Sequence, residues 1–148
     1  MMDRQDSIIS ALQEFFQHKA ERFNVQTAFL YGSRARGFPR HDSDIDIAIA
    51  FNDESSEEEA FEHLTAISLS ISETIGLEVN VIPIYRDFRK PILYYNAIVL
   101  GTPVYVKDFM KYVGLKNEAI YQMEDFEIFG FGWQLALTRK NLEAIQYA

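Results

Sequence analysis

The stretch Tyr31–Ile49, which reads YGSRARGFPRHDSDIDIAI, places all three of its arginines before its three aspartates. The preceding residues Val25–Tyr31 are mostly apolar, include β-branched and aromatic side chains and stop at Gly32, which predicts a mostly buried strand. From Asp44 to about Phe51, bulky apolar residues alternate with aspartate or alanine, which predicts a second strand with all of its bulk on one face. The separated charges therefore lie at the junction of two predicted strands.

The two aspartates of the second strand are spaced to act on one site. Asp44 and Asp46 project from the same face of a strand, with α-carbons roughly 6.6 Å apart. Two ionised carboxylates side by side repel each other and favour a bound cation, and hard oxygen ligands favour Mg²⁺ or Mn²⁺ over zinc. Paired metals would suit phosphoryl or nucleotidyl transfer. The alternative is a solvated strand face, and Asp42 is expected to lie in the loop.

The arginine-rich half has the composition of a phosphate site. Gly32 and Ser33 follow a predicted strand, and a tight turn with a helix start there would present free backbone N–H groups, the Ser33 hydroxyl and Arg34 or Arg36 to an anion. The alternative is an ordinary turn with surface arginines. Taken together, the two halves indicate cations that hold a polyphosphate and carboxylates that hold the metal bridging its phosphates.

The remaining periodicity predicts helices that alternate with strands. Gly76 and Gly101 are expected to end two of the helices, and Pro83 places its strand near an edge or a loop. The apolar stripe of the second helix is predicted to be Phe61, Leu64, Ile67, Ile71 and Ile75. In chain order, helices are predicted at 6–23, from the acidic run 52–62 to 76, within 91–101 and at about 134–147, and further strands at 77–84 and just before 106.

The length, charge and cysteine content of the chain exclude several classes of protein. The chain has 148 residues, which is enough for one sizeable core, and a net charge of -8, which opposes nonspecific binding to nucleic acid or anionic lipid. It contains no cysteine, so it has no disulfide and no thiolate metal site, and zinc is not expected. Neither a signal peptide nor a membrane span is indicated, and a cytoplasmic location is expected.

At the combined motif the sequence resembles a known family. Gly32-Ser33, ten residues and Asp44-x-Asp46 are similar to the motif of the DNA polymerase β-like nucleotidyltransferases, particularly their minimal (MNT) branch. The resemblance covers about 25–106 and implies an α/β (α+β) nucleotidyltransferase fold, a small mixed sheet flanked by helices. Residues 1–148 would form a single domain, with a C-terminal helical extension at 107–148.

The family resemblance also implies a function. Minimal nucleotidyltransferases are commonly antitoxins of HEPN ribonuclease toxins, and they transfer AMP from ATP to a tyrosine hydroxyl of that partner. Carried onto this chain, Gly32, Ser33, Arg34 and Arg36 would bind the nucleotide, and Asp44 and Asp46 would bind Mg²⁺ or Mn²⁺. Other functions left open are neutralisation of the partner by occlusion alone and nucleotidyl transfer to a small molecule such as an antibiotic.

The chain departs from the family pattern at one position. The family normally supplies a third catalytic carboxylate from the neighbouring strand, and here Asn80 stands in that place. An amide oxygen can coordinate Mg²⁺ but brings no charge and is no base, so metal affinity and deprotonation of an incoming hydroxyl should both suffer. Glu78 shares a strand face with Asn80 and is an alternative ligand, and a partner chain is another source.

For several further residues the sequence allows two interpretations. His41 is expected in the loop, near a phosphate or simply solvated, and His18 and His63 are expected on helix surfaces. Arg89 and Lys90 either approach the triphosphate or lie on the surface. The aromatic segment beyond Lys107 packs against the first helix or forms a contact surface in a homo- or hetero-oligomer.

Overall fold

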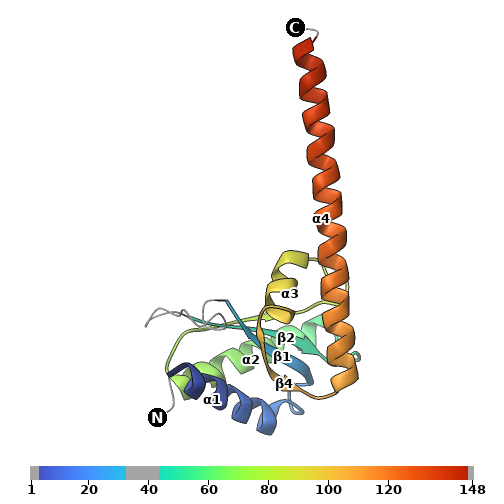
Figure 1. Ribbon diagram of the computed structural model, residues 1–148. Coiled ribbons are helices and arrows are strands. Elements are labelled where there is room, and N and C mark those ends of the chain that lie inside the picture. Colours follow the sequence, from blue (N-terminus) through green and yellow to red (C-terminus); the bar gives the residue numbers. More distant parts are fainter. Residues whose placement is uncertain (1–3, 33–43, 147–148) are drawn as a thin grey trace.

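The computed structural model describes residues 4–32 and 44–146, which form a four-stranded mixed sheet flanked by helices (Figure 1). The strand order is β3-β2-β1-β4, in which β1 is antiparallel to β2 and β4, and β3 is parallel to β2. The predicted α/β class and mixed sheet are confirmed. The elements are α1 (Arg4–Lys19), β1 (Val25–Tyr31), β2 (Ile45–Phe51), α2 (Glu57–Ile75), β3 (Val79–Pro83), α3 (Pro91–Ile98), β4 (Thr102–Val106) and α4 (Phe109–Gln146).

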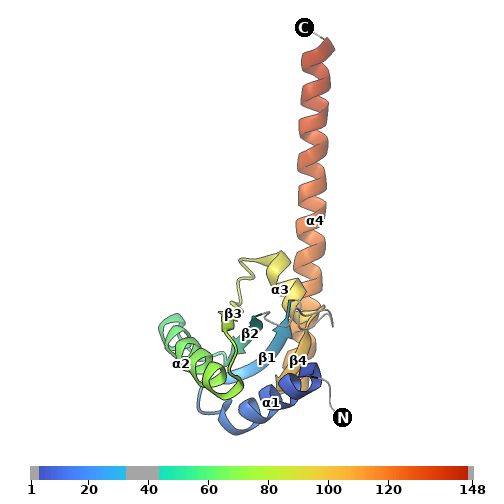
Figure 2. The same ribbon diagram turned by 90° about the vertical axis from the view of Figure 1, so that its left-hand side faces the viewer.

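The sheet separates two clusters of buried apolar side chains. On one face, α1 and α2 pack over the isoleucines of β2 and contribute Leu12, Phe16 and Ile67. On the other face, α3 and the first turns of α4 pack over the smaller Ala48 and Ala50 (Figure 2). Because β2 alternates isoleucine with aspartate or alanine, its α3 side has little bulk, and this is the side on which Asp46 lies.

Most predicted element positions hold. β1 has the predicted bounds, and β3 is an edge strand of the described sheet that ends at Pro83. Gly76 caps α2 in the left-handed conformation, with φ of 79°, and its N–H donates to the Ser72 carbonyl at 2.8 Å. α1 ends at Lys19 rather than near Phe23, since the chain turns before β1. α3 ends at Ile98, three residues before the predicted stop at Gly101.

Two predictions about α2 are wrong. Phe61 is 69% exposed, and Ala60 is buried instead, because Ala60, Leu64, Ile67 and Ile71 form the core-facing stripe and Phe61 is rotated about 100° from Ala60. His63 is not a surface residue: it is half-buried, with its ring 5.7 Å from that of Phe23.

The C-terminal helix begins far earlier than predicted. α4 starts at Phe109 rather than near Gln134, and the Asp108 carboxylate caps its start by accepting from the Met110 and Lys111 N–H groups at 2.9 and 3.3 Å. Glycines and aromatic residues lower the helix propensity of this region, but no proline interrupts it after Pro103. Among the described helices, α4 included, none joins enough length to enough apolar character to cross a lipid bilayer.

The start of α2 provides a stability prediction. Ser56 precedes the helix, and its hydroxyl accepts from the Glu59 N–H at 3.2 Å. Ser56→Ala should lower the free energy of unfolding by about 1 kcal/mol, because this N–H loses its partner. The measurement is urea unfolding, with Ser56→Asp as the control that keeps a capping oxygen. Equal loss in both variants would contradict this role of the hydroxyl.

Candidate active site

Asp44, Asp46 and Asn80 meet at the start of the parallel strand pair. Asp46 aligns with Asn80 across β2 and β3, and Asp44 lies directly before β2. The Asn80 side-chain Nδ2 donates to Asp46 Oδ1 at 3.3 Å and to Asp44 Oδ2 at 3.4 Å. The amide therefore links the two carboxylates, in the place where the family resemblance implies a third acid. Asp44 and Asn80 are exposed and Asp46 is half-buried, so the group is open to ligands.

Gly32 brings the end of β1 against this group. Its φ is 76°, which L side chains rarely adopt, and a Cβ added to it would lie only 2.6 Å from Asp46 Oδ2. The backbone that leads into Ser33 thus passes directly beside a carboxylate oxygen. Any other residue here would adopt a strained backbone conformation and would displace the Asp46 carboxylate from its position.

Tyr31 is a residue of this site that the sequence analysis did not single out. It pairs with Asp46 across β1 and β2, and its ring packs at the edge of the α3-side core. Burial, with a smaller contribution from the Asp46 charge, raises the pKa of Tyr31 to about 12. The hydroxyl therefore stays protonated between pH 10 and 12, where an exposed tyrosine loses its proton. The sequence feature that could have identified Tyr31 as a site residue is its position at the end of the predicted strand, next to Gly32.

The raised pKa of Tyr31 predicts a pH dependence of stability. The ordinary value is 10.0 and the folded value is about 12, so the stabilisation is present below pH 10 and is lost as the pH rises toward 12. Tyr31→Phe should therefore lose less stability over this range than the unmodified chain. The loss of stability is measured by thermal unfolding between pH 9 and 12, with Tyr121→Phe as the control at an exposed tyrosine. Identical pH profiles for all three proteins would contradict the prediction.

Some of the predicted site residues belong to the segment 33–43, between the two described parts of the chain. Ser33, Arg34 and Arg36, predicted to bind the nucleotide, lie outside the described residues, and so do His41 and Asp42. Among the predicted site residues that are described, Gly32, Asp44, Asp46 and Asn80 come together.

Glu78 does not add a third carboxylate to the group. It is exposed and precedes β3, where its backbone carbonyl accepts from the Ile45 N–H at 2.9 Å. Among the side chains that the structure describes, no three acidic or histidine groups lie closely enough together to hold a metal ion. The donor set in this part of the chain is therefore two carboxylates and one amide. These are hard oxygen donors of the kind that suits Mg²⁺, although with less charge than three carboxylates would supply.

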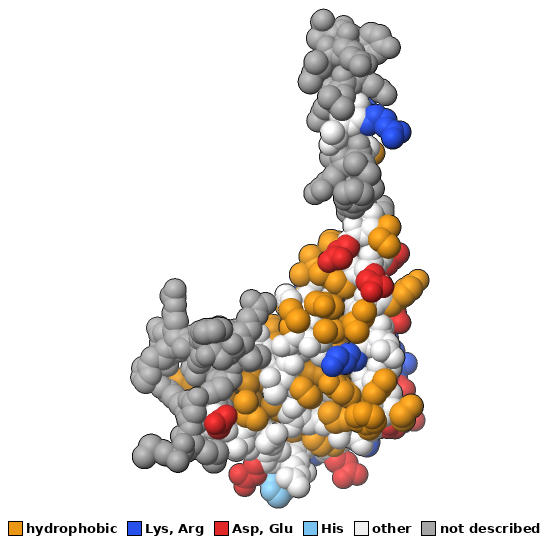
Figure 3. Space-filling view, viewed as in Figure 1, with side chains coloured by type: hydrophobic (Ala, Val, Ile, Leu, Met, Phe, Trp, Pro, Cys, Tyr) orange, Lys and Arg blue, Asp and Glu red, His pale blue; other side chains and the backbone are white. Residues whose placement is uncertain are grey.

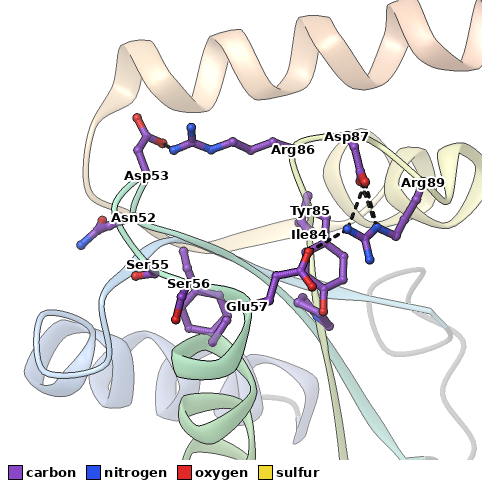
Figure 4. Close-up of a pocket in the computed structure, with 13 residues that line it drawn as sticks. Asn52, Asp53, Ser55, Ser56, Glu57, Ile84, Tyr85, Arg86, Asp87 and Arg89 are labelled. Atoms are coloured by element: carbon purple, nitrogen blue, oxygen red, sulfur yellow. Dashed lines mark hydrogen bonds and ion pairs between the residues drawn. The ribbon is translucent and has the colours of Figure 1, made fainter.

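A pocket lies at the other end of the sheet, away from the paired aspartates. Its volume is about 330 Å³, and it is lined by the end of β2, the start of α2 and the loop after β3 (Figure 4). Arg89 belongs to this pocket: it donates to Glu57 at 2.9 Å and to Asp87 at 3.0 Å, and it stacks 3.9 Å above the Tyr85 ring. The hydrogen bonds that Arg89 donates to Asp87 hold the pKa of that carboxyl below its ordinary value. The surface interpretation of Arg89 thus fits, and Lys90 is likewise exposed.

The fold resembles those of solved toxin–antitoxin proteins. A chain from the crystal structure of a toxin–antitoxin with AMP-PNP superposes with a TM-score of 0.61 at 15% identity, covering 92% of this chain and 99% of that one. A chain of the MntA-HepT toxin–antitoxin gives 0.61 at 12% identity, with 87% and 97% covered. A chain from the tri-AMPylated Shewanella oneidensis HEPN toxin in complex with MNT antitoxin gives 0.56 at 13%, with 85% and 98% covered. At these identities the likeness is one of fold.

Sequence comparison identifies the family. No curated protein matches the chain significantly. The family model described as polymerase beta, nucleotidyltransferase matches residues 10–110, which is more than half of the 148 residues and includes every element from β1 to β4. With its mixed sheet and its paired aspartates beside Gly32, this chain belongs to the polymerase β-type nucleotidyltransferase family.

Proposed function

We propose that this protein transfers AMP from ATP to a tyrosine hydroxyl of a HEPN ribonuclease toxin and so acts as the antitoxin of a toxin–antitoxin pair. The observation that carries the proposal is the placement of Asp44 and Asp46 on one face beside the Gly32 turn. Support for the partner comes from the solved structures of similar fold, whose descriptions include a toxin–antitoxin with AMP-PNP and an AMPylated HEPN toxin. In this proposal, residues 1–148 act as one domain in the cytoplasm, without direct contact to nucleic acid.

Asp44 and Asp46 are the proposed Mg²⁺ ligands, and Mn²⁺ would suit the same oxygens. A bound ion would polarise the α-phosphate and neutralise charge on the pyrophosphate leaving group. For an amide to serve as a third ligand, Asn80 must turn its Oδ1 toward the ion, since its Nδ2 now faces both carboxylates. That rotation would exchange two hydrogen bonds for one neutral metal contact.

The nucleotide is proposed to lie along the turn after β1. Gly32 lets the backbone pass close to Asp46, and backbone N–H groups after it, the Ser33 hydroxyl, and Arg34 or Arg36 would hold the triphosphate. The acceptor oxygen then attacks the α-phosphorus, the bond to the pyrophosphate breaks, and the phenolic proton is lost. Because Asn80 is no base, that proton must pass to Asp44, Asp46 or water.

The proposal is tested by mass spectrometry on the toxin. We expect ATP and Mg²⁺ together to increase the toxin mass by one adenylyl group per modified tyrosine, and EDTA to prevent the increase. Catalytic inactivation of the toxin by a ribonuclease-site substitution should leave the modification unchanged, which separates transfer from toxicity. An unmodified toxin after incubation with the purified chain, ATP and Mg²⁺ would contradict the proposal.

A second candidate function is favoured by Asn80. With an amide joining the two carboxylates, the chain would neutralise the toxin by occlusion alone, as a binding module of the same fold. Growth protection in cells that express the toxin distinguishes the two functions. Protection that survives Asp44→Ala and Asp46→Ala would indicate occlusion, and protection that is lost in both variants would indicate transfer.

A further inference from the structure

The sheet has an open edge along β3. In the described sheet β3 pairs with β2 alone, and no strand lies on its other side. The Ile45 N–H donates to the Glu78 carbonyl at 2.9 Å, which sets the alternation of this parallel pair, so Val79 and Val81 direct their backbone groups outward. The Val79 carbonyl accepts from the Ser68 hydroxyl at 3.0 Å. Within the described part of the chain, both valine N–H groups and the Val81 carbonyl remain available for another strand.

A groove of about 340 Å³ lies beside this edge, between α2 and β3. Phe61 and Leu69 line it from α2, and Val81 lines it from β3. Phe61 and Leu69 are about two turns apart along the helix, and both are more than half exposed. Figure 2 shows α2 next to β3 at this side of the sheet. Exposed apolar side chains gathered beside an open strand edge favour an interaction site.

The charge around the groove has one sign. Residues 52–85 contain eight acidic residues and no lysine or arginine, and all eight are exposed. Among them, Glu58 and Glu62 are one turn apart and adjoin the line from Phe61 to Leu69. Over α4, by contrast, basic side chains lie among the acidic ones (Figure 3). A partner with basic residues is therefore favoured at the groove, whereas a second copy of this chain would bring acid against acid.

A strand added to this edge would extend the sheet next to the paired aspartates. Side chains alternate between the two faces of a sheet, so a residue level with Asn80 would share the face on which Asp46 lies. Its neighbours would point to the other face, where Phe61 and Leu69 line the groove. Strands lie about 4.8 Å apart, which places the added backbone about 10 Å from β2. A tyrosine at that position would extend across this distance toward a phosphate held at Asp46.

We propose that an extended segment of the partner protein adds to β3 as a further strand and presents its acceptor tyrosine level with Asn80. Apolar residues on either side of the tyrosine enter the groove beside Phe61 and Leu69, and basic residues beyond them face Glu58 and Glu62. Backbone hydrogen bonds to the open edge give affinity, and contacts of alternate side chains give specificity. The inference rests on the proposed function, because the tyrosine is the acceptor of that reaction.

Binding of a designed peptide tests the docking without ATP, Mg²⁺ or a toxin. The probe is fluorescein-Lys-Arg-Leu-Tyr-Leu-Arg-Lys-amide, and its fluorescence anisotropy with the full-length chain should show saturable binding that weakens as salt is added. Only every second N–H of a strand faces its neighbour. N-methylation of one alternate set of amides should therefore weaken binding at least about ten-fold, and N-methylation of the other set should leave it within about three-fold. Equal effects of the two sets would contradict strand addition.

Substitutions in the chain locate the docking surface. Val81→Pro removes an outward N–H but no hydrogen bond to β2, and it should weaken peptide binding about ten-fold or more. Leu69→Ser should weaken it about ten-fold, because apolar contact in the groove is lost. Leu69 lies outside both core clusters, so this variant tests the surface even where Val81→Pro lowers stability. Leu100→Ser, at another exposed leucine outside the groove, is the matched control and should bind unchanged.

Disulfide formation tests the position of the tyrosine. The chain contains no cysteine, so an introduced thiol has no background. Under mild oxidation, Asn80→Cys should cross-link to the probe peptide with cysteine in place of tyrosine, because residues level with each other on neighbouring strands are close enough for a disulfide. A peptide with cysteine in place of either leucine directs its thiol to the other face and should not cross-link. The reverse preference would contradict the proposed orientation.

Failure of the peptide to bind at millimolar concentration, or unchanged binding in Leu69→Ser, would overturn the proposal. Dimers of the purified chain that are lost in Val81→Pro would also overturn it, since the edge would then bind a second copy. A toxin that Val81→Pro modifies at an unchanged rate would overturn the docking and leave the proposed transfer standing. A bound peptide together with an unmodified toxin would contradict the transfer and leave the docking standing.

Discussion

Asp46→Asn is expected to abolish AMP transfer, with a loss of about 10²–10³-fold or more in rate. The substitution keeps the shape of the side chain and its neighbourhood with Gly32, but it removes the charge that would hold Mg²⁺ and stabilise its position on the α-phosphate. Asp46 is the half-buried member of the carboxylate pair, accepts a hydrogen bond from Asn80 and lies where a Cβ on Gly32 would meet its Oδ2. The rate is measured by mass spectrometry of the toxin under single-turnover conditions.

The matched control is the same substitution at an exposed aspartate elsewhere. Asp53 follows β2 at the opposite end of the sheet, where it pairs with Arg86 and with Lys111 at 3.5 Å. Asp53→Asn should leave the transfer rate within about two-fold, since exposed ion pairs contribute little. If both Asp46→Asn and Asp53→Asn retained the full transfer rate, the paired aspartates would not be the catalytic site.

Asn80→Asp is expected to increase Mg²⁺ affinity about 10–100-fold and to raise the transfer rate at limiting Mg²⁺. The new carboxylate would complete a set of three beside Asp44 and Asp46. Without metal, the same variant should be less stable, by about 1 kcal/mol or a melting temperature about 3 °C lower. It loses the two Nδ2 hydrogen bonds and gains like-charge repulsion.

The two effects are measured separately and have opposite signs. In EDTA, the melting temperature of Asn80→Asp should lie below that of the unmodified chain. As Mg²⁺ is added, it should rise above that of the unmodified chain, because ligand binding stabilises the folded state. Asn80→Ala is the control, since it removes the hydrogen bonds without adding charge and should gain no more stability from Mg²⁺ than the unmodified chain does. An Asn80→Asp variant that Mg²⁺ does not stabilise would show that the charge at this position does not govern metal binding.

The local parts of the fold could be predicted from the sequence. The alternation of isoleucine with aspartate or alanine predicted that Asp44 and Asp46 point to one side at the start of β2, and Gly76 was predicted as the end of α2. Both follow from short-range rules: a strand has a period of two, and glycine accepts the left-handed conformation. The same rules did not predict the start of α4. Its glycines and aromatic residues have low helix propensity, although the helix runs continuously from Phe109.

The sequence by itself determined the residue types of the site and the faces on which its carboxylates lie. Only the tertiary structure decided that Asp46 aligns with both Asn80 and Tyr31, and that Gly32 approaches its carboxylate. It likewise decided that Ala60 rather than Phe61 is buried. The physical reason is that strand register and helix docking depend on packing between residues far apart in the chain, whereas periodicity and turn conformation are set by neighbours.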